Sequence, residues 1–93
     1  VSEMKESLRD LAEALAKCED RELIEDFLGA ILTPHELKEV TSRWALVRLL
    51  DEKMSQRKIA EKLGMSLCKI TRGSQEYQKT DSPFRKMIDL YKK

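Results

Sequence analysis

Basic side chains that could bind phosphate gather in one short stretch, residues 53–72. This stretch contains six lysines or arginines and one acid, a local charge of +5, whereas residues 1–32 contain nine acids and four bases, a local charge of −5. Although the net charge of the chain is only +1, its negative and positive charges are concentrated in different segments, so the chain is dipolar. Lysine and arginine clustered on one element are typical of a surface that binds nucleic acid. A helical hairpin with solvated charges is the simpler alternative.

The spacing of apolar and capping residues predicts that residues 55–73 form two helices joined by a sharp turn. Ser55 and Ser66 are good N-caps, and Gly64 stands where a left-handed residue would end the first helix. This pattern is typical of a helix-turn-helix motif, whose second helix reads a DNA groove. The residues expected to face inward between the two helices are Ile59, Ala60, Leu63, Leu67 and Ile70.

The remaining sequence predicts four more helices, which makes an all-α chain. Thr33-Pro34-His35-Glu36 combines an N-cap, a proline in the first turn and a capping-box acid, and so predicts the start of a helix. The predicted helices cover residues 2–18, 21–32, 34–50 and 83–91, and a polar link is expected at residues 75–80. Their apolar faces exceed what one small core absorbs, so we expect a second subunit. Trp44 is expected to anchor the core.

Few residues in this chain favour catalysis or metal binding. Cys18 and Cys68 lie far apart without a CxxC pair, and His35 is the only histidine. There is no nucleophile motif and no phosphate-binding loop, so we expect neither an enzyme nor a metal site. No run approaches the roughly 20 apolar residues that span a bilayer, and the first residues do not resemble a signal peptide. A cytoplasmic location is expected.

Three stretches resemble the bacterial trp repressor family: LTPHE at 32–36, MSQRKIAEKLG at 54–64 and KITRGS at 69–74. The resemblance runs from about Leu32 to Ser74. It implies one domain over residues 1–93 that forms an intertwined homodimer, with core helices at about 2–50 and 82–92 and a DNA-reading head at about 55–73. It also implies that L-tryptophan is the corepressor, bound between the core and each head.

The family's tryptophan-binding positions transfer to this chain residue by residue. Two arginines, Arg43 and Arg72, would hold the indole between their planar guanidinium groups, and Arg72 would also donate to the ligand carboxylate. Glu76 stands where the family usually has a serine, and a carboxylate there can pair with the ligand ammonium. Ala30 replaces a leucine of the family. The resemblance implies tryptophan binding by Leu32, Thr33, Arg43, Arg72, Gly73 and Glu76.

In the implied ligand site, Gly73 is expected to leave room for the indole edge, and Thr33 to offer a hydroxyl or carbonyl oxygen to the amino-acid end. Lys69 replaces a small polar residue of the family and adds charge to the groove surface. The junction before Met54 is about one residue shorter than the family pattern. The resemblance implies DNA contacts by Gln56, Arg57, Lys58, Leu67, Cys68, Lys69, Thr71 and Arg72.

The resemblance, together with the basic helix-turn-helix pattern, implies a tryptophan-dependent transcriptional repressor that binds operator DNA as a homodimer and controls tryptophan biosynthesis or uptake genes. Two alternatives stay open. A repressor of the same fold could ignore tryptophan, because Ala30 and Glu76 change the ligand site. A helical interaction domain could instead use the basic face to bind an acidic protein.

Overall fold

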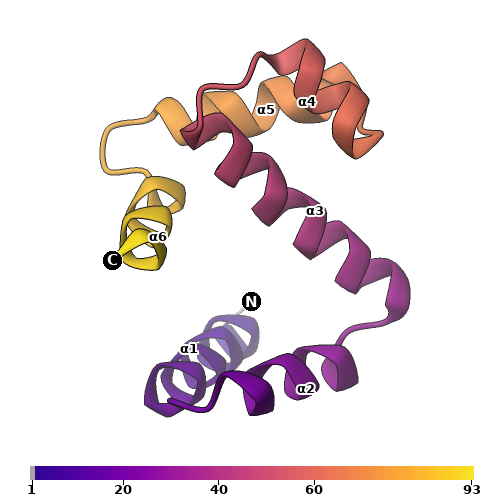
Figure 1. Cartoon of the computed structure of the whole chain (residues 1–93). Coiled ribbons are helices and arrows are strands. Elements are labelled where there is room, and N and C mark those ends of the chain that lie inside the picture. The colour runs from indigo at the N-terminus through magenta and orange to yellow at the C-terminus, as the bar shows by residue number, and fades with distance from the viewer. Residues whose placement is uncertain (1) are drawn as a thin grey trace. The chain divides into compact units, whose positions relative to one another are not determined.

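The chain is all-helical in the computed structural model, which describes residues 2–93 (Figure 1). Over those residues it has no strand, and the predicted six-helix, all-α architecture is confirmed. The described residues form two compact units, residues 2–37 and residues 38–93. The helices are α1 (Ser2–Lys17), α2 (Arg21–Ile31), α3 (Pro34–Asp51), α4 (Gln56–Leu63), α5 (Leu67–Gln78) and α6 (Pro83–Lys92).

Local capping explains where most of these helices begin. The Asp20 side chain accepts a hydrogen bond from the Leu23 backbone N–H at 3.2 Å, and Ser55 and Ser66 cap α4 and α5 in the same way. Before α3, the Thr33 N–H donates to Glu36 Oε1 at 2.8 Å. The Glu36 N–H donates back to the Thr33 hydroxyl at 3.1 Å, which completes the predicted capping box.

The turns on either side of α4 both use a left-handed residue. Gly64 has φ of 64° and ends α4 as predicted. After α3, Lys53 has φ of 66°, although it carries a side chain. Its N–H donates to the Leu50 carbonyl at 3.0 Å, and the Met54 N–H reaches the Leu49 carbonyl at 3.2 Å. These two bonds close a Schellman-type turn, so α4 can follow α3 after a very short junction.

Helix α5 is longer than predicted. The prediction that it ends at Gly73 and that residues 75–80 form a polar link is wrong, because α5 continues to Gln78. Gly73 lies inside the helix, where a Cβ atom would stand only 2.5 Å from Leu46 Cδ2. The glycine therefore permits a close approach of α5 to α3 rather than ending the helix. Ser74, the next residue, is buried at 5% exposure.

The core of the C-terminal unit lies under the helix-turn-helix motif. Leu46 and Leu49 of α3 pack with Ile59 of α4 and Ile70 of α5, and all four are buried. The expectation that Leu67 also points inward is wrong, because this residue is 54% exposed. It stands in the first turn of α5, whereas Ile70 one turn later meets α4. The partly buried apolar residues packed against this core are Leu50, Met54, Ala60, Leu63 and Met65.

Apolar side chains remain uncovered in both units. No residue of α1 or α2 is buried, and Met4 and Leu8 on α1 are 70% and 65% exposed. In the C-terminal unit Trp44 is 37% exposed, and its ring makes a T-shaped contact with the Tyr91 ring at a centroid distance of 5.8 Å. The described chain therefore does not bury Trp44 in its core. Among residues 2–93, none of the helices has the length and apolar character that crossing a bilayer requires.

Candidate ligand site and nucleic-acid interface

The α4–α5 pair presents a polar, basic surface on a rigid support. Ile59 and Ile70 are completely buried between the two helices, which fixes their angle. On the outer side, the Thr71 hydroxyl donates to Gln56 Oε1 at 3.2 Å and links the two helices. Every residue for which sequence analysis predicted a DNA contact is exposed: Gln56, Arg57, Lys58, Leu67, Cys68, Lys69, Thr71 and Arg72.

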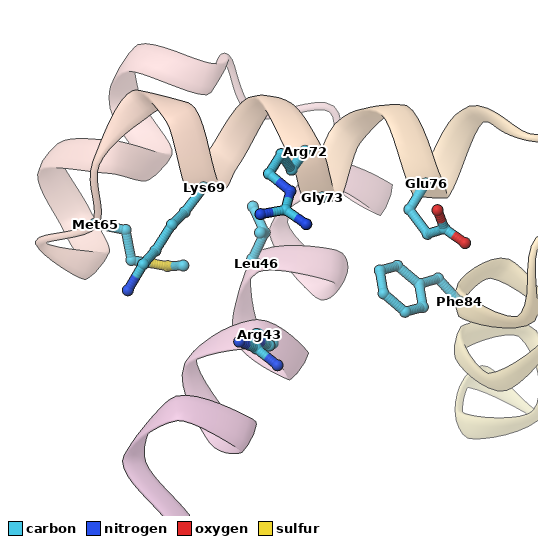
Figure 2. A pocket seen from close by; sticks show the side chains of 8 residues that line it. All are labelled: Arg43, Leu46, Met65, Lys69, Arg72, Gly73, Glu76 and Phe84. Atoms are coloured by element: carbon cyan, nitrogen blue, oxygen red, sulfur yellow. The ribbon is translucent and has the colours of Figure 1, made fainter. Parts of the chain in front are cut away.

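A cavity of about 340 Å³ lies beside this motif, within the C-terminal unit (Figure 2). Its size falls in the range of about 300–1,000 Å³ that small-molecule sites occupy. Its walls come from α3, the turn between α4 and α5, α5 itself and α6. The lining residues are Arg43, Leu46, Met65, Lys69, Arg72, Gly73, Glu76 and Phe84.

Two arginines line this cavity from different helices. Arg43 extends from α3 and Arg72 from α5, as Figure 2 shows. A guanidinium group is planar, always charged and able both to stack on an aromatic ring and to donate two parallel hydrogen bonds to a carboxylate. A flat anionic ligand between the two helices would meet both groups.

Gly73 lines the same cavity, but the space facing it is filled. The side chain beside Gly73 is Leu46, which is 3% exposed and belongs to the core. The expectation that Gly73 leaves room for an indole edge therefore needs a refinement: its missing Cβ first makes room for Leu46. Leu46 in turn forms an apolar wall of the cavity.

Glu76 gives the cavity a negative group one turn beyond Gly73. Figure 2 shows its carboxylate on the side where Phe84 of α6 lies. The Lys79 ammonium stands 2.8 Å from this carboxylate; the Lys79 side chain is 64% exposed and that of Glu76 is 42% exposed. Because the cationic groups lie toward α3 and the start of α5, the cavity offers opposite charges to the two ends of a zwitterion.

Three lining residues were not singled out from the sequence: Leu46, Met65 and Phe84. Each comes from a different part of the C-terminal unit, and only the packing of α3 and α6 against α5 brings them together. Their apolar character fits an aromatic ligand, because most of the surface in such pockets is apolar. Lys69, expected only at the DNA surface, also lines the cavity.

Leu32 and Thr33 lie in the other unit, so their predicted contact with the ligand stays a prediction. Leu32 caps α2 and donates its N–H to the Leu28 carbonyl. The Thr33 hydroxyl accepts the Glu36 N–H, which leaves its own proton free to donate. The Thr33 carbonyl accepts the Leu37 N–H at 2.8 Å.

A polar cluster fixes the far end of α5 and the end of α6 to α3. The Tyr77 hydroxyl donates to Asp51 Oδ1 at 2.8 Å, and Lys92 Nζ donates to Asp51 Oδ2 at 2.9 Å. The bonds from Lys92 and Tyr77 lower the pKa of Asp51. Partial burial and the bond to Asp51 raise the pKa of Tyr77, and the bond to Asp51 raises the pKa of Lys92.

Known proteins are similar to this chain over most of its length. The sequence profile of the family described as Trp repressor protein matches residues 6–91. A "Trp operon repressor homolog" of Chlamydia trachomatis serovar L2 is 35% identical over 74 residues, which cover 78% of this chain and 79% of that protein. The homolog of Chlamydia caviae is 36% identical over 85% of this chain and 79% of its own length.

The homolog of Vibrio campbellii is 32% identical over 88% of this chain and 84% of its own length. No solved structure shows a significant match to the chain.

Proposed function

Because this chain belongs to the Trp repressor family, a family of transcription regulators and not of enzymes, we propose that it is a tryptophan-dependent repressor. In this proposal it binds operator DNA as a homodimer and controls genes of tryptophan biosynthesis or uptake. The observation that carries the proposal is the cavity that α5 shares with α3: the helix that would read DNA also supplies Arg72 and Gly73 to a ligand-sized site.

DNA binding is supported by the surface of α4 and α5. Six basic residues lie between Lys53 and Arg72 against the single acid Glu61. The contact residues at the start of α4 would hold phosphates, while α5 would lie in the major groove and read base edges. Lys69 adds a charge to that surface, so we expect a steep decrease of affinity with salt.

Tryptophan binding is supported by the chemistry of the cavity walls. In the proposed complex, Arg43 and Arg72 stack on the two faces of the indole, and Arg72 also donates to the carboxylate. The ligand ammonium pairs with Glu76 and displaces Lys79 from it. Leu46, Met65 and Phe84 exclude water from the ring edges.

The ligand would act as a wedge between α3 and the reading head. For a symmetric helix-turn-helix dimer, of which the Trp repressor is one familiar example, the two reading helices must meet successive grooves about 34 Å apart. If tryptophan favours that arrangement by about 10- to 100-fold, it contributes about 1.4 to 2.7 kcal/mol. A change of this size switches DNA binding without remaking the fold.

Dimerisation is supported by the uncovered apolar faces. Leu23 and Ile31 on α2 are 56% and 54% exposed, and Leu90 on α6 is 62% exposed. A chain of 93 residues gains much of its stability from such surface only when a partner covers it. We therefore propose that α1, α2 and the exposed parts of α3 and α6 build a shared core in a cytoplasmic homodimer.

Calorimetric titration of the purified protein with L-tryptophan tests the ligand half of the proposal. The wild type should bind it, and Arg72→Ala should weaken binding at least tenfold, because a charge-assisted and stacked contact is lost. Arg72→Lys should recover little of this affinity, since an ammonium cannot form the planar contact. Unchanged affinity in Arg72→Ala would show that the cavity is not the site.

A repressor that does not respond to tryptophan is the second candidate. It is favoured by two contacts that already occupy the cavity walls, Leu46 against Gly73 and Lys79 on Glu76. Gel-shift titrations with and without tryptophan separate the two functions. Equal binding in both series would favour this second candidate.

A further inference from the structure

Lys69 differs from the other basic residues of the reading head. Six lysines and arginines lie between Lys53 and Arg72. Within residues 2–93, Lys69 is the one member of this set that forms an ion pair. Its partner is Glu39 of α3, with Lys69 Nζ 3.6 Å from Glu39 Oε2. The contact therefore ties α5 to a helix outside the DNA-reading pair.

The Glu39 carboxylate is held in place from its own helix. The same oxygen, Oε2, lies 3.8 Å from an Arg43 nitrogen one turn along α3. Residues four apart on a helix face one another, so this pair orients the carboxylate before Lys69 meets it. The Glu39 side chain is also the less exposed partner, at 32% against 56% for Lys69. Lys69 is therefore the partner that stays more accessible to solvent.

We propose that Glu39 is an internal competitor for DNA phosphate at Lys69 and sets the affinity of the reading head; this inference rests on the proposed DNA-binding function. To contact a DNA phosphate, the Lys69 ammonium must either move away from the Glu39 carboxylate or interact with both anions at once. The wild-type chain therefore binds DNA with part of the Lys69 charge neutralised. Glu39 acts through Lys69, so it is a positioning residue and not a DNA-contact residue.

The size of the effect follows from the exposure of the pair. Exposed ion pairs change an equilibrium by a modest factor, and here that factor is about two- to fivefold. Glu39→Gln removes the negative charge and keeps the shape of the side chain. It should tighten DNA binding by this factor, whereas a loss of α3 stability would weaken binding.

The test uses a fluorescent palindromic duplex that the wild-type protein selects from a random-sequence library in the presence of L-tryptophan. Anisotropy titrations with saturating tryptophan compare four full-length proteins: wild type, Glu39→Gln, Lys69→Gln and the double variant. Glu39→Gln should bind two- to fivefold tighter than wild type. In the Lys69→Gln background the same replacement should change nothing, because the competition requires the lysine.

Glu52→Gln is the matched control. Glu52 also pairs with an arginine four residues away, Arg48, at 3.4 Å, and within residues 2–93 it forms no ion pair with the reading head. If Glu52→Gln, or Glu39→Gln in the Lys69→Gln background, tightens binding as much as Glu39→Gln alone, the effect is one of net charge and the inference fails. No change in Glu39→Gln also overturns it. If circular dichroism shows that the Glu39→Gln protein is unfolded, Glu39→Ala is used in its place.

Failure of the proposed function has a different signature. If the wild type selects no duplex, DNA binding itself is refuted, and the inference with it. If the wild type binds and the variants all bind equally, only the role of Glu39 is refuted.

Discussion

Replacing Gly73 with alanine tests the close approach of α5 to α3. The added Cβ would lie 2.5 Å from Leu46 Cδ2 and 3.3 Å from Leu46 Cγ, whereas carbon atoms pack at about 3.5–4.0 Å. Leu46 is only 3% exposed and packs in the core with Leu49, Ile59 and Ile70, so moving it away from the new Cβ disturbs these contacts. Overpacking of this kind costs about 1–3 kcal/mol.

The same substitution also has a favourable effect. Alanine is better than glycine in a helix interior by up to about 1 kcal/mol, and Gly73 lies inside α5. Subtracting this gain leaves a net destabilisation of about 1 kcal/mol. For a chain of this size, such a loss lowers Tm by about 4–8 °C.

Urea unfolding followed by circular dichroism, at one fixed protein concentration, measures the effect. Gly29→Ala is the matched control, because Gly29 lies inside α2 and its Cβ would meet nothing within 4 Å. It should stabilise the protein by up to about 1 kcal/mol. If Gly73→Ala stabilises the protein as much as Gly29→Ala does, the packing described for α5 and Leu46 is wrong.

Three further predictions concern the C-terminal unit. Tyr77→Phe should lower the free energy of unfolding in urea by about 1 kcal/mol, because the 2.8 Å bond to Asp51 is lost. Asp51→Asn should be less stable than wild type at neutral pH. Since folding lowers the Asp51 pKa, this deficit should disappear in urea titrations as pH falls below the ordinary value of 3.8 and through the lowered pKa. Gly64→Ala should lower unfolding free energy by about 1 kcal/mol, because φ of 64° disfavours a side chain; no loss would contradict the turn.

Local signals predicted most of the helix boundaries. Asp20, Thr33, Ser55 and Ser66 act through hydrogen bonds to backbone groups three residues away, so their effect can be recognised in the sequence alone. Gly64 likewise ends α4 through its own left-handed backbone conformation, with φ of 64°, and depends on no distant residue. These features made the helix-turn-helix motif predictable without tertiary information.

Tertiary contacts explain what the sequence could not predict. The sequence pattern predicts a helix end at Gly73, but the contact with Leu46 of α3 decides the role of this glycine, and that contact joins residues distant in sequence. The continuation of α5 is supported by the bond from Tyr77 to Asp51, which no local pattern indicates. Met65 and Phe84 join the cavity for the same reason: helix packing, and not spacing along the chain, brings them there.

The central claim is that occupancy of the cavity by tryptophan controls DNA binding by α5. The most direct measurement is the anisotropy of the selected palindromic duplex, titrated with the protein in the absence of tryptophan and at saturating tryptophan. The account predicts that tryptophan tightens binding by about 10- to 100-fold, and that Arg72→Ala removes most of this gain. Equal affinity of the wild type with and without tryptophan would contradict it.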